Sequence, residues 1–125
     1  DIHGNDASTS FTVTVVDNEA PVITNTPSNI TVNNDLGNCS AVVTWTAPTA
    51  ADNCAVDTFV STHNPGDVFP VGTTTVTYTA TDIHGNVSST EFDVIVQDLE
   101  APVVTCISDM TVSTDVDVCT YTIPN

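Results

Sequence analysis

The chain has 125 residues, which is enough for one domain of ordinary size, and 40% of them are hydrophobic, which is enough to form a core. It contains sixteen aspartates and glutamates but no lysine or arginine, so its formal net charge is −16. This composition excludes nucleic acids and anionic membranes as partners because no side chain can neutralise phosphates, and no apolar run approaches the ~20 residues needed to insert into a bilayer.

Only 13% of the residues are charged, which predicts a folded and not a disordered chain. Short alternating runs rich in valine and threonine predict that the fold is all-β. The clearest run places Val76, Tyr78 and Ala80 on one face of a strand, and His84-Gly85-Asn86 supplies a turn to an adjacent antiparallel strand. Seven short strands predict an antiparallel sandwich of two sheets. In chain order they are expected at residues 21–24, 29–33, 40–46, 56–61, 68–71, 73–82 and 91–97.

An internal repeat sets the domain organisation. The pentapeptide Asp1–Asn5 recurs unchanged at Asp82–Asn86, an offset of 81 residues, and Cys39 matches Cys119 after a gap of one residue. The chain is therefore interpreted as part of a tandem array in which neighbouring repeats of the same chain are the first partners. The predicted units are residues 1–16 as the last strand of one repeat, 17–98 as a complete domain, and 99–125 as the first strands of the next.

The order of several short segments resembles a known family, the hyalin repeat (HYR) module. The resemblance implies an immunoglobulin-like or fibronectin-III-like sandwich in an extracellular protein, often in tandem, with a role in adhesion and not in catalysis. The segments, in order, are Glu19-Ala20-Pro21, Cys39, Val42-Val43-Thr44-Trp45, Pro48, Asp52-Asn53-Cys54, Phe69-Pro70-Val71-Gly72, and Val76 to Asp82 followed by Gly85-Asn86.

The resemblance also implies a disulfide. Members of the family commonly carry an outer and an inner pair of cysteines; here Asn25 and a position near Thr90 replace the outer pair, while Cys39 and Cys54 remain. The joint loss of one pair and retention of the other predict a bond between Cys39 and Cys54, worth roughly 3 kcal/mol. The chain would have to double back, with Pro48 as the turning point, to bring them together. The alternative is two buried free thiols.

Acidic residues in the linkers between repeats predict a calcium site. In a sandwich of this topology, the turn that holds Asp82 faces the preceding linker, so Asp17 and Glu19 would converge on it. Calcium prefers six to eight oxygen ligands drawn from such loops. The alternative is a set of solvated turn residues. The candidate ligands are Asp17, Glu19, Asp52, Asn53 and Asp82, with Asp98 and Glu100 as their counterparts in the following linker.

The remaining polar motifs predict no catalysis. His3 and His84 occupy one repeat position seen twice, and His63 lies in another turn, so all three are expected to be surface histidines without a second ligand at metal-binding spacing. No nucleophile motif is present. Three Asn-x-Ser/Thr triplets are candidate glycan acceptors, although chance also produces them in such a chain. Their asparagines are Asn29, Asn38 and Asn86.

The favoured function is a structural or adhesive module in an extracellular rod, surface adhesin or filament, secreted or at the cell surface. Its partners would be neighbouring repeats, other copies in a filament and glycans. An alternative is a glycan-binding or protein-binding accessory module of a larger secreted protein. The two differ in chain architecture, since a long uniform array favours the first and a few repeats beside other domains favour the second.

Overall fold

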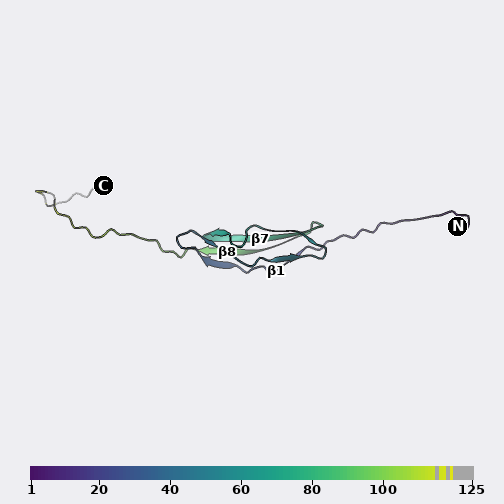
Figure 1. The fold of residues 1–125 in the computed structure, drawn as a ribbon, viewed down its shortest axis with the longest axis horizontal. Helices are drawn as coiled ribbons and strands as arrows, with labels where there is room; N and C mark the ends of the chain where they lie inside the picture. Colours follow the sequence, from purple (N-terminus) through teal and green to yellow (C-terminus); the bar gives the residue numbers. More distant parts are fainter. Residues whose placement is uncertain (115, 118, 120–125) are drawn as a thin grey trace.

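A computed structural model describes residues 1–114, 116, 117 and 119, and these residues form eight strands and no helix (Figure 1). No segment of the described chain is therefore a helix that could span a membrane. The rest of the predicted following repeat, residues 115, 118 and 120–125, lies outside the described residues. The strands are β1 (Val22–Thr24), β2 (Ile30–Asn33), β3 (Ser40–Val42), β4 (Thr49–Ala51), β5 (Val56–Ser61), β6 (Val68–Pro70), β7 (Gly72–Asp82) and β8 (Val87–Gln97).

The two longest strands, β7 and β8, form the hairpin that the alternating sequence predicts. They pair from Gly72 opposite Val96 to Thr81 opposite Val87, and the turn between them passes through Gly85 with φ +90°. Successive residues of a strand point to opposite faces, so one face of the hairpin collects the apolar side chains. Those buried side chains are Val76, Tyr78, Ala80, Phe92, Val94 and Val96.

A four-stranded sheet with the order β2-β8-β7-β5 forms one layer. β5 has the predicted bounds and pairs antiparallel with β7, with an irregularity between Val56 and Thr58. β2 runs parallel to β8, from Ile30 opposite Val94 to Asn33 opposite Gln97. The expectation of a wholly antiparallel sandwich is wrong at this edge, because the chain crosses from the other layer and enters β2 in the direction of β8.

The opposite layer consists of two short ladders, β3–β6 and β1–β4. The single strand predicted for residues 40–46 ends at Val42, because Trp45 turns into the core and its Nε1 donates a hydrogen bond to the Tyr78 hydroxyl at 2.9 Å. Pro48 follows and lacks a backbone donor. The chain then forms β4, which the sequence did not predict, and pairs with β1. The second sheet is thus split where Trp45 enters the interior.

The core lies between these layers. The Trp45 ring meets Phe69 of β6 at 5.9 Å between centroids and Phe92 of β8 at 5.3 Å, both edge-on. Such contacts add to the free energy of apolar burial. The all-β, sandwich-like fold class is confirmed. The buried cluster is Ala41, Val43, Phe69, Val76, Tyr78, Phe92, Val94 and Val96, with Ile30, Val32, Trp45 and Phe59 packed against it.

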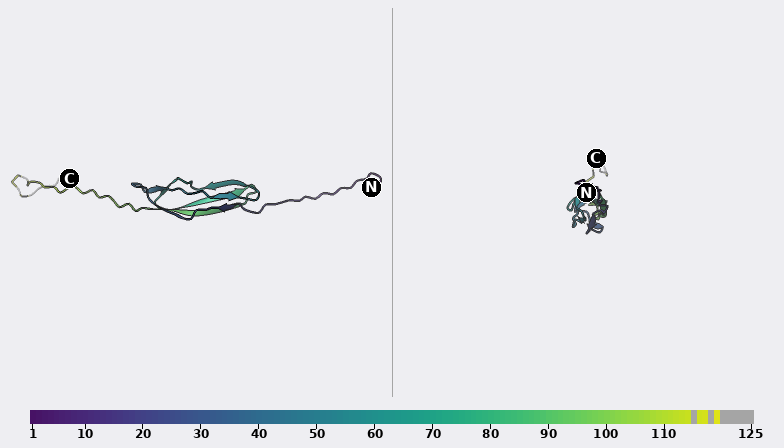
Figure 2. Two further views of the ribbon diagram at one scale, coloured as in Figure 1. Left: turned by 60° about the horizontal axis from the view of Figure 1, so that its bottom comes forward. Right: turned by 90° about the vertical axis from the view of Figure 1, so that its right-hand side faces the viewer.

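The chain enters the sandwich at one end and leaves it at the opposite end (Figures 1 and 2). We call these ends the N-terminal pole, which contains Asp17 and Asp82, and the C-terminal pole, which contains Cys39 and Asp98. Residues 5–16 and 99–114 form no strand, and a strand requires a hydrogen-bonded neighbour that the chain does not supply for them. The 81-residue period and the three domain boundaries stay predictions.

The predicted disulfide between Cys39 and Cys54 is wrong, and both cysteines are free and exposed. The carbonyl of Cys39 accepts a hydrogen bond from Val71, just before β7, while Ala55 next to Cys54 bonds Ile83, just after β7. The 11 residues of β7 therefore separate the two thiols by about 33 Å, far beyond the 4.4–6.8 Å between bonded Cα atoms. The chain does not double back at Pro48 but runs from one pole to the other.

Candidate cation site at the N-terminal pole

Asp82, the last residue of β7, anchors the turn at the N-terminal pole. It is the one charged residue among those described that is fully buried, with 2% of its surface exposed. Its Oδ1 accepts the backbone N–H groups of His84 and Asn86, each at 2.8 Å, and its Oδ2 accepts the Asn86 side-chain amide at 2.7 Å. Burial raises the pKa of Asp82, but these bonds from Asn86 and His84 outweigh it, so the pKa lies below its ordinary value.

Asp17 brings the linker to the same place. Its side chain is only 6% exposed, its backbone carbonyl accepts the Asn86 amide at 3.2 Å, and its Oδ2 lies 3.2 Å from Nδ1 of His84. The backbone N–H of Glu19, at 3.0 Å from Oδ1, lowers the pKa of Asp17, and the Cys54 thiol adds to this effect. The linker is thereby fixed to the β7–β8 turn by side chains from that turn.

Asp52 completes the group from the segment after β4. Its Oδ2 accepts the backbone N–H groups of Cys54 at 2.8 Å and Ala55 at 3.2 Å. Its Oδ1 is buried and, within the described part of the protein, has no hydrogen-bond partner. A buried carboxylate oxygen without a partner destabilises the folded state, and a bound cation or a hydrogen-bond donor would remove this penalty.

The structure brings Asp17, Asp52 and Asp82 together, with one carboxylate oxygen from each lying within 4.8 Å of the others. Oxygens that share one Ca²⁺ at ~2.3–2.6 Å are at most about 5 Å apart, so the three residues fit a common ion. The chain has no lysine or arginine to neutralise them. Hard oxygen ligands, a net negative charge and an unpartnered buried oxygen are together suited to calcium.

A second grouping, Asp17, Cys54 and His84, places a sulfur and a ring nitrogen within 4.8 Å of the same carboxylate. These residue types are those of a zinc site or of a thiol nucleophile, and both functions require the thiolate. The hydrogen bond to Asp17 raises the pKa of Cys54, and partial desolvation of the sulfur and the nearby negative charges raise it further, although the residue as a whole is exposed. Without a bound metal, the environment of Cys54 therefore lowers its share of thiolate, which disfavours a role as a catalytic nucleophile.

Of the other predicted ligands, Asn53 borders the three aspartates, whereas Glu19, Asp98 and Glu100 are not part of the cluster. The side chain of Glu19 is exposed, and only its backbone reaches Asp17. Asn53 is exposed and lines a shallow hollow with Asp17 and His84. Asp98 and Glu100 lie at the opposite pole, where Glu100 Oε2 accepts the N–H of Gly37 at 2.9 Å.

Two residues that hold the site were not predicted as part of it. Asn86 bridges the linker and Asp82 through one amide nitrogen, and His84 contacts Asp17 although its side chain is 47% exposed. His84 is thus the expected surface turn histidine, but with a carboxylate partner. The signal was in the sequence, because Asp, His and Asn are unchanged between the two copies of the repeated pentapeptide.

The three candidate glycan acceptors differ in how the structure uses their amides. Asn29 is exposed, and only its Oδ1 is engaged, accepting the N–H of Asp93 at 2.9 Å. Asn38 is exposed and its nitrogen donates to Leu36. Asn86 is half-buried, and a glycan on its nitrogen would remove one of the two hydrogen bonds that this atom donates. Of the three, only the side-chain nitrogen of Asn29 makes no hydrogen bond within the described residues, and glycosylation stays a prediction.

Because the pKa values of Asp17 and Asp82 are lowered in the folded state, the domain should lose stability as the pH falls. A carboxyl whose pKa is lower in the folded than in the unfolded state stabilises the fold above the unfolded value, here 3.8, and loses this effect as the pH falls through the folded value. Thermal unfolding followed by Trp45 fluorescence in chelator should show Tm falling below about pH 4. Asp82→Asn should flatten this dependence; a Tm that rises on acidification would contradict the assignment.

A family model for the HYR domain matches residues 16–96, from just before Asp17 to the last residues of β8. This chain belongs to the HYR domain family. The matched segment contains every strand of the sandwich and all three clustered aspartates. The resemblance read from the sequence is confirmed.

Relatives of this HYR domain include hyalin of Strongylocentrotus purpuratus, 44% identical over 85% of the chain, and hyalin of Lytechinus variegatus, 45% identical over 81%. A third is the sushi, von Willebrand factor type A, EGF and pentraxin domain-containing protein 1 of Rattus norvegicus, 42% identical over 70%. The matches span only 9%, 20% and 2% of these proteins' own lengths. No solved structure matches the chain.

Proposed function

We propose that this HYR domain is a structural and adhesive repeat unit of an extracellular rod, surface adhesin or filament. The observation that carries the proposal is the position of its two linkers. The chain reaches the sandwich at one pole and departs from the other, so repeats joined through these linkers extend in a line (Figure 2). Membership of the HYR family and the likeness to hyalin support an extracellular setting.

The N-terminal pole supplies a means to stiffen such a line. Asp17 belongs to the linker, whereas Asp52 and Asp82 belong to the sandwich, so an ion held by all three would tie the linker to the domain. Calcium would supply charge neutralisation and coordination, and the protein would supply three carboxylates already positioned by backbone hydrogen bonds. Bound calcium would then reduce bending at each junction.

We assign the domain no catalytic role. The hollows at its two poles are open to solvent and lined by a mixture of acidic, amide and apolar residues, and the Cys54 thiol beside His84 has a raised pKa. Catalysis by a cysteine needs the opposite shift.

Small-angle scattering can test the proposal on a two-domain chain made of residues 1–97 followed by residues 17–125. With calcium, we expect an elongated particle with two sandwiches in line. With chelator, the same chain should show a broader distribution of dimensions, because the junction bends more freely. Two sandwiches packed side by side in both conditions would refute the proposed rod.

A further inference from the structure

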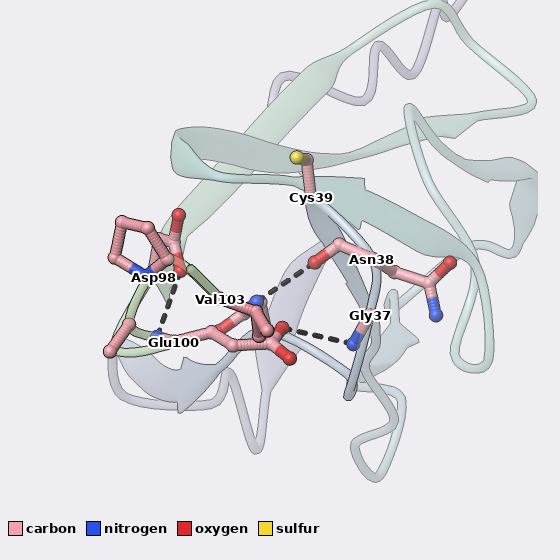
Figure 3. A pocket seen from close by; sticks show the side chains of 9 residues that line it. Gly37, Asn38, Cys39, Asp98, Glu100 and Val103 are labelled. Carbon is pink, nitrogen blue, oxygen red and sulfur yellow. Dashed lines mark hydrogen bonds between the residues drawn. The ribbon is translucent and has the colours of Figure 1, made fainter. Parts of the chain in front are cut away.

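The two cysteines of the sandwich lie at opposite poles, and each is exposed. Cys54 is at the N-terminal pole, where its Sγ and a carboxylate oxygen of the linker residue Asp17 are within 4.8 Å of each other. Cys39 is at the C-terminal pole, where it lines a hollow together with the linker residue Asp98 (Figure 3). Each cysteine therefore borders a hollow that a linker also lines, at the pole that a neighbouring repeat would approach.

The repeat relates these two linkers to each other. Asp98 is offset from Asp17 by 81 residues and begins the same Asp-x-Glu-Ala-Pro segment. In a continuing array, Asp98 occupies for the following domain the place that Asp17 occupies for this one. The following domain's counterpart of Cys54 would then lie next to Asp98, and Asp98 shares its hollow with Cys39.

We propose that Cys39 of one repeat forms a disulfide with the Cys54 position of the next repeat. The proposal rests on the tandem arrangement of the proposed function. It explains why both cysteines are present although β7 holds them about 33 Å apart within one domain. Cys54 of this domain would likewise pair with the Cys39 position of the preceding repeat.

The bond requires an oxidant, for which we name a small-molecule disulfide such as oxidised glutathione. The thiolate of one cysteine attacks this disulfide, forming a mixed disulfide and releasing one reduced glutathione. The second cysteine's thiolate then displaces the other glutathione, so that two protein thiols are oxidised to one disulfide and one glutathione disulfide is reduced to two thiols. Such conditions exist in secretory and extracellular compartments.

The two-domain chain defined above provides the test. In the cross-junction variant, every cysteine except Cys39 of the first copy and Cys54 of the second is replaced by serine. In the matched control, only Cys39 and Cys54 of the first copy remain. Both are equilibrated with mixtures of oxidised and reduced glutathione, free thiols are counted by maleimide labelling, and intact mass separates the protein disulfide from glutathione adducts, which are not counted as oxidised pairs. We expect at least a tenfold higher oxidised-to-reduced ratio for the cross-junction pair than for the control pair.

Equal oxidation of the two pairs, or oxidation of the control pair alone, would overturn the proposal. Oxidised cross-junction material that migrates as a covalent dimer would overturn it as well, since the bond would then join separate chains. The same two-domain chain with all cysteines changed to serine separates this proposal from the previous one. If its scattering shows two sandwiches in line while the cross-junction pair stays reduced, only the disulfide fails.

Discussion

Calcium is expected to raise the Tm of this HYR domain by roughly 10–20 °C when the ion is present at ~100 times its Kd. Binding to the folded state alone contributes about 2.7 kcal/mol at that excess, and each kcal/mol moves Tm by ~4–8 °C in a domain of this size. The reason is local: the unpartnered Oδ1 of Asp52 and the oxygens of Asp17 and Asp82 gain a common ligand. Calorimetry with calcium and with chelator measures the shift.

Asp52→Asn makes the test specific, because its effect on stability should have opposite signs without and with calcium. Without calcium, the variant should be at least as stable as the parent, since one of three crowded charges is gone and an amide N–H replaces the unpartnered oxygen. With calcium, it should need about tenfold more ion for the same shift, because affinity depends on ligand charge. Asp57→Asn, an exposed aspartate of β5 outside the cluster, is the control with the same charge change. A parent Tm that does not change with calcium, or an equal shift of Tm by calcium in the Asp52→Asn and Asp57→Asn variants, would exclude the site.

Phe69→Ala should destabilise the sandwich by about 3–5 kcal/mol, the range for deleting a buried phenylalanine ring. Phe69 is 1% exposed, sits in the three-residue strand β6, and contacts the ring of Trp45. A domain of ~80 residues has only about 4–12 kcal/mol to lose, so much of the population could unfold and Tm should fall by more than ~10 °C. Calorimetry is the suitable measurement, because the substitution also changes the surroundings of the fluorescent Trp45.

Phe11→Ala is the matched control for this experiment. Phe11 is 88% exposed and precedes the sandwich, so its removal should leave Tm within about 2 °C of the parent. An effect equal to that of Phe69→Ala would mean that residues 1–16 fold into the sandwich as an essential part. A small effect of Phe69→Ala would mean that the two layers are not held together by this ring.

The strands that were predicted best are those in which apolar and polar residues alternate along the sequence. Val76, Tyr78 and Ala80 alternate with threonines, and the structure buries them as expected. β4 escaped prediction because it has only three residues, two of them alanine, a residue with little preference for strands. The parallel pairing of β2 with β8 has no local signature, because it depends on where the chain crosses between layers.

The site was predictable where the repeat fixed the topology. Asp17 and Asp82 were expected to converge because the β7–β8 turn had to face the preceding linker, and they lie together. The position of Asp52 depended on the path of residues 46–53, which the sequence left open. The same open path led to the wrong expectation for Cys39 and Cys54, since nothing local to Pro48 tells a turn from a short break before a new strand.

The parallel pairing of β2 with β8 has a mechanical consequence. Both strands run toward the C-terminal pole; when the array is stretched, the pull enters at the N-terminal pole and reaches β2 through β1, and it leaves at the end of β8. Tension would then slide the two strands lengthwise past each other and strain the backbone hydrogen bonds between them in shear, all at once instead of one after another. An edge arranged in this way resists stretching far better than one that can be peeled open from its end.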